Sequence, residues 1–412
     1  MKVTTGIFLI PFLLISSTAE VHLSGNQYLT LDQQPFFVIG AYDLPEGMTL
    51  AEGQKMGFNV VRVSTQQSQW DTAGELGLKV WHSFGSRMDF ASGDVEEKKN
   101  VIRKTVERFK DHPALLYWES MDEPAWTNGN PAQARATPEG LTAGYEYLKS
   151  LDPEHPVYMN HAPRNMVETL QKYNTACDLV CVDIYPIIPP GLKQMYAITP
   201  DGRHGDLPNQ TPSCVGEYVD KMKAVANAEQ SVFIVLQGFA WEATRAKNPD
   251  KKLVRYPTWK ESRFMAYNAI SHGAGGILYF GLHTVPKEHP FVQDLARVLQ
   301  EISRMTPVFS GRDLPTLPKL KYHERGSTIA GGIEMMLRET SEGTYLITSN
   351  TSIDPAAAEF INLPLQFSST QELVVPGEDR TVLVKDGTFF DEFDGLDVHI
   401  YYSASASRPE DE

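Results

Sequence analysis

The chain has 412 residues, of which 42% are hydrophobic and 22% are charged, as in an ordinary globular protein. This length exceeds what one hydrophobic core usually serves, so we expect one large domain and a smaller one. The formal charge of −15 argues against a nucleic-acid partner and against docking on an anionic membrane, because both require a basic surface.

The N-terminal segment MKVTTGIFLIPFLLISSTAE has the pattern of a secretory signal, with Lys2, an apolar stretch from Ile7 to Ile15 and small residues at 17–19. We predict that residues 1–19 are a signal peptide cleaved after Ala19 and that the mature protein is secreted or periplasmic. The apolar stretch is too short to span a bilayer, and no cysteine follows it to carry a bacterial lipid anchor. An uncleaved N-terminal anchor is the alternative. No later segment approaches transmembrane length, so we expect no membrane insertion of the mature chain.

From residue 36 to 309, short apolar segments alternate with amphipathic segments of helical length. The apolar segments, which we expect to be strands buried on both faces, are PFFVIGAYDLP, FNVVRVST, LKVWHSFGSR, ALLYWESMDEP, PVYMNHAP, CDLVCVDIYPI, SVFIVLQGFAW and GGILYFGLH. Strand–helix alternation predicts parallel βαβ units, and eight units of this length predict a closed (β/α)₈ barrel over residues 20–309. The alternative, an open doubly wound sheet, usually has a glycine-rich phosphate loop after its first strand, and AYDLPEGM is not one.

The pattern changes after Thr306-Pro307. Short strand-like segments separated by the turn sequences SEGT, PGED and KDGT predict a β-sandwich over residues 310–404. The C-terminal residues 405–412 are predicted to be a disordered tail.

The chain has three cysteines, Cys177, Cys181 and Cys214. This number is odd and too low for a disulfide-stapled scaffold, and the first two fit core positions beside a strand. No Cys/His spacing indicates a metal site, and we expect no cofactor.

The active site of a (β/α)₈ barrel lies at the C-terminal ends of its strands. The residues at these ends of the predicted strands are Tyr42 and Asp43; Arg62; Trp81 and His82; Trp118, Asp122 and Glu123; Asn160 and His161; Asp183 and Tyr185; Gln237 and Trp241; and Tyr279 and His283. Buried polar groups cost free energy unless they are paired, so we do not expect such a ring by accident.

These residue types suit glycoside hydrolysis of an oligo- or polysaccharide. Aromatic faces stack on sugar rings, polar side chains bind hydroxyls, and a carboxylic acid protonates the departing glycosidic oxygen. Glu123 is the best candidate for this acid, because an adjacent carboxylate and an aromatic pocket would both raise its pKa. The catalytic candidates are Glu123, Asp122 and Asp183, and the substrate-binding candidates are Arg62, His82, Trp118, His161, Tyr185, Gln237, Trp241 and Tyr279.

The series Arg62, His82, Asp122-Glu123-Pro124 and Tyr185 resembles the large superfamily of (β/α)₈ glycoside hydrolases, in which an Asn-Glu-Pro motif at the fourth strand supplies the acid/base. HPALLYWESMDEP, VDIYPI and VFIVLQGFAW together resemble a less characterised branch of that superfamily. The resemblance covers residues 36–309, and the C-terminal sandwich is similar to an accessory domain that many of these enzymes carry.

This chain departs from the superfamily pattern at two positions. The residue before the glutamate is Asp122 rather than asparagine, and Gln237 stands where the seventh strand of the superfamily ends on a glutamate nucleophile. A neutral amide cannot attack an anomeric carbon or deprotonate water. The usual two-glutamate retaining mechanism therefore does not transfer to this chain.

Three interpretations accommodate the missing glutamate. In the first, the substrate's 2-acetamido group is the nucleophile and Asp122 orients it, as the paired acids of β-hexosaminidases and β-N-acetylgalactosaminidases do. In the second, another carboxylate acts with Glu123: Asp183 first, then Glu242 or Asp43. In the third, the barrel binds glycans without catalysis. A metal-dependent hydrolase is disfavoured because the strands contain no His-x-His pair. The sugar, the linkage and the oligomeric state stay open.

A structural alternative stands beside each candidate. Glu123 before a proline has the position of a helix cap, Asp122 that of a structural hydrogen-bond acceptor, and Asp183 that of a turn cap. The other candidates with a structural alternative, as core or packing residues, are His82, His161, Gln237, Trp81, Trp118, Trp241 and Tyr279.

Overall fold

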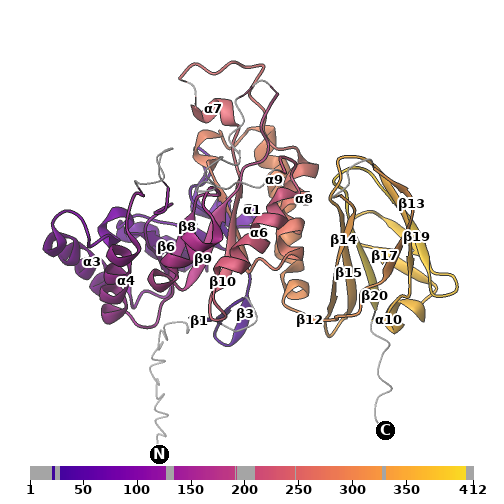
Figure 1. The fold of residues 1–412 in the computed structure, drawn as a ribbon, viewed down its shortest axis with the longest axis horizontal. Coiled ribbons are helices and arrows are strands. Elements are labelled where there is room, and N and C mark those ends of the chain that lie inside the picture. Colours follow the sequence, from indigo (N-terminus) through magenta and orange to yellow (C-terminus); the bar gives the residue numbers. More distant parts are fainter. Residues whose placement is uncertain are drawn as a thin grey trace, which may run out of the picture.

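The computed structural model describes residues 21–23, 28–126, 134–190, 192, 209–245, 247–326 and 331–404. The described chain forms a barrel, a small N-terminal sheet and a C-terminal pair of sheets that lies beside the barrel (Figure 1). The predicted signal peptide and C-terminal tail lie outside the described residues.

Eight parallel strands form a closed barrel in the order β4 to β11, and β11 pairs with β4 to complete the circle. The strands are β4 (Val38–Ala41), β5 (Val60–Arg62), β6 (Lys79–Ser83), β7 (Leu115–Glu119), β8 (Val157–His161), β9 (Leu179–Asp183), β10 (Ser231–Gln237) and β11 (Gly276–Phe280). The predicted (β/α)₈ barrel is confirmed.

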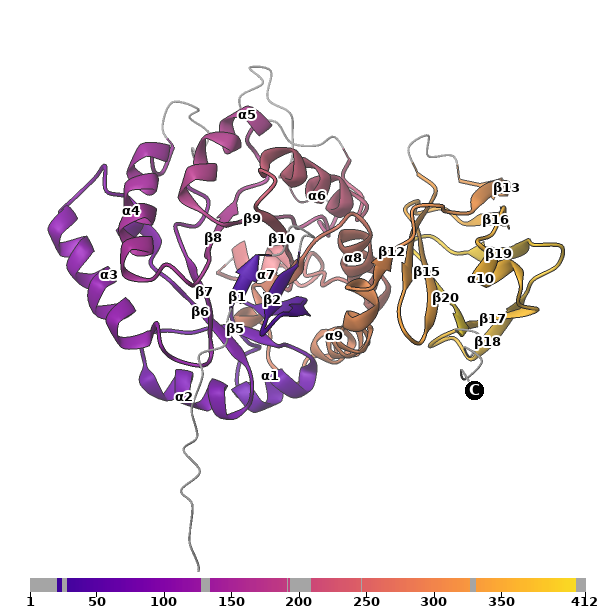
Figure 2. The same ribbon diagram turned by 90° about the horizontal axis from the view of Figure 1, so that it is seen from below.

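Helices surround the barrel, as the view from below shows (Figure 2). They are α1 (Leu50–Met56), α2 (Gln67–Glu75), η1 (Gly85–Met88), α3 (Val95–Phe109), α4 (Pro138–Leu151), α5 (Val167–Leu170), η2 (Gln171–Ala176), α6 (Cys214–Val225), α7 (Trp241–Arg245), α8 (Trp259–Ser271), η3 (Leu282–Thr284) and α9 (Pro290–Phe309). Local sequence sets several of their starts. Thr49 and Thr258 each form a capping box with the glutamate three residues later, and α4 and α9 begin with proline.

A small antiparallel sheet, which the sequence did not predict, closes the N-terminal end of the barrel. It consists of β1 (Val21–Leu23), β2 (Leu29–Leu31) and β3 (Gln34–Phe36). Val21 and Leu29 are buried in the same hydrophobic cluster as the barrel-interior residues Val38 and Val60. This cluster fills the barrel from below, so the opposite, C-terminal end is the one left for a cavity.

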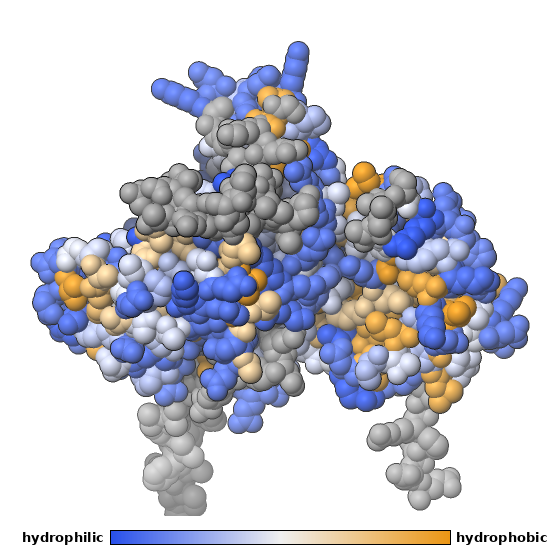
Figure 3. Space-filling view, viewed as in Figure 1, coloured by the Kyte–Doolittle hydropathy of each residue, from blue (hydrophilic) through white to orange (hydrophobic). Residues whose placement is uncertain are grey.

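The C-terminal region is a sandwich of two antiparallel sheets. The larger sheet has the order β12 (Arg312–Asp313), β14 (Ile333–Glu339), β15 (Gly343–Asn350), β20 (Val398–Ala404), β17 (Glu372–Val375) and β18 (Arg380–Leu383). The smaller has the order β13 (Lys319–Arg325), β16 (Ala356–Ile361) and β19 (Phe389–Phe393), and α10 (Leu365–Ser368) follows β16. Leu337 and Leu346 of the larger sheet share a core with Phe360 and Phe389 of the smaller. On the face seen in Figure 3, hydrophobic residues gather on the sandwich, and hydrophilic residues predominate elsewhere.

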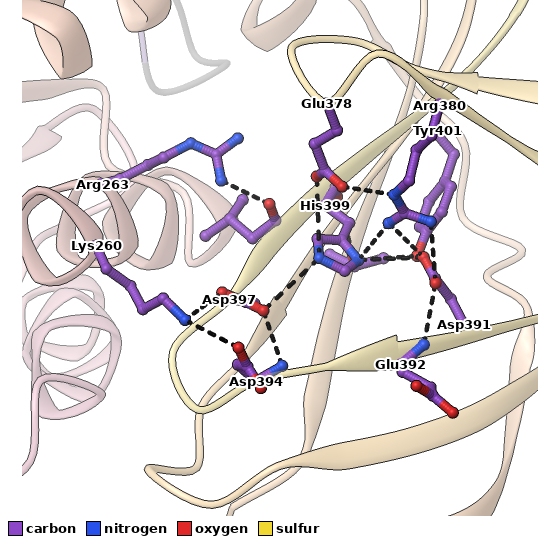
Figure 4. Close-up of polar contacts among 12 residues, drawn as sticks. Lys260, Arg263, Glu378, Arg380, Asp391, Glu392, Asp394, Asp397, His399 and Tyr401 are labelled. Atoms are coloured by element: carbon purple, nitrogen blue, oxygen red, sulfur yellow. Dashed lines mark hydrogen bonds and ion pairs between the residues drawn. The ribbon is translucent and has the colours of Figure 1, made fainter.

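Charged side chains join the sandwich to α8 and α9 of the barrel (Figure 4). Arg263 of α8 forms an ion pair with Glu301 of α9 and donates from Nη1 to the backbone oxygen of Val398 at 2.6 Å. Lys260 forms an ion pair with Asp397 at 2.7 Å. The two parts are therefore held by specific contacts.

His272 makes a further contact between barrel and sandwich. Its Nδ1 lies 2.8 Å from Asp220 of α6, and its Nε2 lies 3.0 Å from Glu334 of β14. Burial lowers the pKa of the imidazole, but the hydrogen bond and charge of Glu334, together with those of Asp220, outweigh burial and raise the pKa above 6.5. A raised folded-state pKa stabilises the fold fully below the ordinary pKa of about 6.5, and this contribution is lost as the pH rises through the folded-state value.

We therefore expect His272→Gln to lower the melting temperature more at pH 5.5 than at pH 8.5. Thermal unfolding of the two proteins at both pH values measures this difference. His323→Gln, at an exposed histidine of the sandwich, is the control and should show little pH-dependent loss. An equal loss for His272→Gln at both pH values would contradict the account of this contact.

Candidate active site

The C-terminal ends of the barrel strands surround a cavity of about 400 Å³. Trp241 of α7, the helix above the barrel in Figure 1, is part of its wall. The size of the cavity lies within the range of roughly 300–1,000 Å³ that is typical of small-ligand sites. The lining residues are Tyr42, Arg62, Ser83, Glu119, Asp122, Glu123, Trp126, Asn160, Pro163, Arg164, Asp183, Tyr185, Trp241 and Phe280.

The alternation of side chains along a strand decides which strand-end residues reach this cavity. Tyr117, Tyr158 and Cys181 fill the barrel interior. Two positions further along the same strands are the inward-facing polar residues that line the cavity, namely Glu119, Asn160 and Asp183. Residues between these positions point outward, toward the helices.

Glu123 lies four residues beyond the end of β7, with a backbone φ of 46°. This left-handed conformation is unfavourable for a residue other than glycine by an amount on the order of 1–3 kcal/mol. Two backbone hydrogen bonds hold the turn: Glu123 N donates to Asn160 O at 2.9 Å, and Trp126 N donates to Glu123 O at 3.0 Å. Strain of this kind gathers at functional sites, and here it presents a carboxyl group to the cavity.

The Glu123 side chain is 20% exposed, and Arg135 Nη1 donates to its Oε2 at 2.9 Å. Burial raises the pKa of the Glu123 carboxyl, and the charge of Asp122 raises it further. Arg135 acts in the opposite direction, and the resulting pKa is about 7. At neutral pH the protonated and ionised forms of this carboxyl are therefore present in comparable amounts. A group that donates a proton and later accepts one requires such a balance.

Asn160 joins the two other acidic candidates. Its Nδ2 donates to Asp122 Oδ1 at 2.9 Å and lies 3.3 Å from Asp183 Oδ1. Burial raises the pKa of Asp183 well above its usual value, and the charges of Glu123 and Asp122 raise it further. Desolvation also raises the pKa of Asp122, although the Asn160 hydrogen bond and the nearby Arg135 and Arg62 oppose this. Because like charges this close oppose one another, ionisation of one carboxyl raises the pKa of its neighbours.

Glu119 is a fourth carboxyl in the cavity wall and is buried. Burial raises its pKa to about 7 against the opposing charge of Arg62, and Trp81 Nε1 donates to its Oε2 at 2.8 Å. Its Oε1 has no hydrogen-bond partner among the described residues. A buried oxygen without a partner on a cavity wall is suited to a hydroxyl group of a bound molecule.

Arg62 supplies positive charge to the cavity wall. Its Nε donates to Tyr42 O at 3.2 Å, and its Nη2 forms an ion pair with Asp43 at 3.3 Å. Asp43 is also paired with His283, at 3.3 Å. Asp43 is therefore held by Arg62 and His283 and does not line the cavity.

Aromatic rings form the remainder of the wall. Tyr185 packs edge-on against Trp241, with their centroids 5.9 Å apart, and lies nearly parallel to Phe280 at 6.0 Å. Trp241 Nε1 donates to Tyr185 O at 3.1 Å. On another wall, the guanidinium of Arg164 stacks on Trp126, 5.1 Å from the ring centroid. These rings give the cavity several apolar surfaces.

The cavity thus brings together six of the eleven residues predicted to form the site: Asp122, Glu123, Asp183, Arg62, Tyr185 and Trp241. The other five lie elsewhere. Trp118 and Tyr279 point outward into the core between strands and helices, and Trp118 Nε1 donates to Asp152. His161 is fully buried, and burial lowers its pKa to about 3. His82 faces outward with Nδ1 3.0 Å from Val63 O. Trp118, Tyr279 and His161 have the structural surroundings of core residues, whereas His82 is half-buried and lines a different cavity.

Gln237, the fifth, is fully buried and does not line the cavity. Its amide accepts from Ile187 N at 2.9 Å and donates to Ile187 O at 3.1 Å and to Phe239 O at 3.0 Å. Gln237 therefore fixes the loops after β9 and β10, which carry cavity residues. This role requires a side chain that both donates and accepts hydrogen bonds, as an amide does and a carboxylate does not.

We expect Gln237→Ala to destabilise the protein by about 2–3 kcal/mol, because three buried backbone groups would lose their partner. Gln237→Glu should also destabilise it, since a carboxylate cannot donate to the two carbonyls. Urea unfolding measures both. Gln300→Ala, which removes one exposed hydrogen bond to Lys55 O, is the control. A neutral effect of Gln237→Ala would show that these hydrogen bonds are dispensable.

Several cavity residues were absent from the predicted site. Tyr42 and Asn160 lie at predicted strand ends. Glu119 lies two positions after the inward-facing Tyr117, so the alternation along the strand also predicts that it faces the cavity. Ser83, the last residue of β6, was also missed. The missed loop residues carry no periodic signal; they are Trp126, Pro163 and Arg164 of the lining and Arg135, which contacts Glu123.

The described residues contain no group of three or more His, Cys, Asp or Glu side chains arranged to hold a metal ion. Within the same part of the chain, no helix is long and apolar enough to cross a membrane. The three cysteines are buried and unpaired.

Solved structures with the same architecture are glycoside hydrolases. A family 5 glycoside hydrolase from Bacteroides vulgatus superposes with a TM-score of 0.60 at 12% identity, covering 94% of this chain and 93% of its own. A second structure, described as a glycoside hydrolase, has a TM-score of 0.59 at 15% identity and covers 95% of this chain and 98% of its own. An α-amylase from Geobacillus thermoleovorans in complex with acarbose has a TM-score of 0.55 at 10% identity, with 90% and 99% covered.

No protein-family model matches the chain, and no curated protein is similar to it in sequence. At such low identity the likenesses to solved structures establish the fold alone. The chain has the barrel-and-sandwich fold of (β/α)₈ glycoside hydrolases.

Proposed function

We propose that this protein is an exported glycoside hydrolase in which Glu123 is the general acid/base. The observation that carries the proposal is the Glu123 carboxyl, which lines a cavity of about 400 Å³ at the mouth of a closed barrel and has a pKa of about 7. A carboxyl with this pKa is suited to protonate the departing glycosidic oxygen near neutral pH. The secretory pattern of residues 1–19 supports export.

Asp183 is proposed as the second catalytic carboxyl. It lines the same cavity, and its pKa responds to the charge of Glu123, so the two groups interact. The two other carboxylates considered for this role are engaged elsewhere. Asp43 pairs with Arg62 and His283, and Glu242 accepts a hydrogen bond from Asp250 N. Asp122, bound by Asn160, orients the substrate or polarises Glu123.

The substrate is proposed to be an oligo- or polysaccharide. The aromatic rings of Trp126, Tyr185, Trp241 and Phe280 supply stacking surfaces in the cavity. Glu119 has a buried carboxyl oxygen available for a hydroxyl group. A mixture of apolar faces and a few polar groups is what a sugar ring requires.

A panel of aryl glycosides with and without a 2-acetamido group tests this proposal. Cleavage of glycosides that lack the group, with loss of cleavage in Asp183→Asn, supports Asp183 as the second carboxyl. Cleavage of 2-acetamido glycosides alone would indicate that the substrate's 2-acetamido group is the nucleophile and that Asp122 orients this group. Binding of glycans without cleavage of any glycoside would overturn the hydrolase proposal and leave a glycan-binding barrel.

A further inference from the structure

A second cavity, of about 460 Å³, lies at the same end of the barrel as the candidate active site. It lies between the loop after β5, the η1 turn after β6, and α3. Its lining residues, which we call the rim groove, are Ser64, Thr65, His82, Ser83, Phe84, Arg87, Val101, Lys104, Thr105, Arg108 and Phe109. The floor is partly aromatic, because Phe84 and Phe109 are buried there, and the hydroxyls of the threonines and serines add polar groups.

The rim groove is positively charged, although the chain as a whole has a formal charge of −15. Arg87, Lys104 and Arg108 line it, and no Asp or Glu is among the described residues that do so. Within the described part of the chain, neither Arg87 nor Lys104 has a carboxylate partner within 4.0 Å, whereas the helix neighbours Lys99 and Arg103 are paired with Glu96 and Glu107. Arg108 lies over the Phe109 ring and binds Gln67 rather than a carboxylate. Two cations on this groove are therefore available to an external anion.

The rim groove adjoins the catalytic cavity. Ser83 lines both cavities. The η1 turn that carries Arg87 is tied to the acid-bearing strand end, since Phe84 N donates to Glu119 O at 3.0 Å and Gly85 N to Ser120 O at 3.2 Å. His82, next to Ser83 in the chain, lines the rim groove. Burial lowers its pKa, and the charges of Arg87 and Arg62 lower it further. A chain bound in the catalytic cavity thus has a short path into the rim groove.

We propose that the rim groove is a subsite for an anionic sugar unit, with Arg87 and Lys104 binding its carboxylate or sulfate group. Guanidinium and ammonium groups bind such anions by charge-assisted hydrogen bonds. This inference rests on the proposed function, and it names the substrate class: an acidic saccharide that extends from the catalytic cavity across Ser83.

Calorimetric binding to the full-length protein tests the subsite. The probes are a tetragalacturonate, an oxidised cellotetraose that carries glucuronate units, and a chondroitin sulfate tetrasaccharide. Each is paired with its carboxyl-reduced or desulfated counterpart, and sodium sulfate alone is a further probe. We expect at least one acidic probe to bind about tenfold or more tightly than its neutral counterpart, with a preference that weakens as the salt concentration rises. Arg87→Gln/Lys104→Gln should abolish the preference.

The matched control is Lys99→Gln/Arg103→Gln, which removes the same charge from the same side of the barrel at positions that do not line the groove. It should keep the preference for the acidic probe. The inference is overturned if no acidic probe is preferred, if the control variant loses the preference equally, or if sodium sulfate alone binds as tightly as the saccharide. Failure of the wild-type protein to cleave any saccharide, with the acidic preference intact, would instead overturn the proposed hydrolase activity.

Discussion

Glu123→Gln is expected to lower kcat on aryl glycosides with poor leaving groups by about 10²–10⁴-fold, because glutamine cannot protonate the departing oxygen. The loss should be much smaller for 2,4-dinitrophenyl glycosides, whose leaving group needs little protonation. Steady-state kinetics on a series of aryl glycosides measures both effects. The glutamine side chain has the same shape and occupies the same strained turn, so the fold should be retained, as circular dichroism would show.

The matched control for this change is Glu242→Gln. Glu242 follows β10 on α7 and does not line the cavity. Its replacement should leave kcat within about twofold of wild type, because surface substitutions away from a site have small effects. Equal losses of kcat in the two variants would contradict the assignment of Glu123 as the acid. A loss in Glu123→Gln that does not depend on the leaving group would also contradict it.

Asp122→Asn and Arg135→Gln are expected to shift the alkaline limb of the pH–kcat/KM profile in opposite directions. The acid must be protonated, so activity falls as the pH rises through the pKa of Glu123, which is about 7. The Asp122 charge raises this pKa, so Asp122→Asn should move the limb to lower pH. Arg135 lowers it through its charge and its 2.9 Å hydrogen bond, so Arg135→Gln should move the limb to higher pH.

Opposite shifts would distinguish an electrostatic role from a structural one. Structural damage would lower activity at every pH without moving the alkaline limb in a particular direction. Arg103→Gln removes a positive charge from α3, where it pairs with Glu107, and should leave the limb in place. Shifts of both site variants in the same direction would mean that another group controls the alkaline limb.

The sequence was sufficient to predict the barrel because its strands are apolar on both faces and alternate regularly with helices. The two outer strands of the smaller sandwich sheet were not predicted. β13, with the sequence KLKYHER, is largely exposed and turns only Leu320 and Tyr322 toward the core, and β19 places Asp391 between its inward-facing phenylalanines in FFDEF. The short β1–β3 sheet was also missed, since three-residue strands carry too little periodicity.

The candidate site was predicted less completely, and the reason is geometric. Sequence reasoning selected conspicuous residues at strand ends without separating the two faces of each strand. Trp118 and Tyr279 face the helices, whereas Glu119 and Phe280, one position later in each strand, face the cavity. Only tertiary structure identifies Arg135, which reaches Glu123 from the segment before α4, and Gln237, whose amide is used to fix loop backbone.

A carbon-13 NMR titration of the Glu123 carboxyl would show whether this group is protonated at the pH at which it is proposed to act as the acid. The full-length protein would be labelled at its glutamate side chains, and the signal absent from Glu123→Gln would be assigned to position 123. The account predicts a midpoint near pH 7 that coincides with the alkaline limb of activity. A midpoint near the ordinary glutamate value of about 4.3 would contradict it, because the carboxyl would then be ionised wherever the enzyme is proposed to donate a proton.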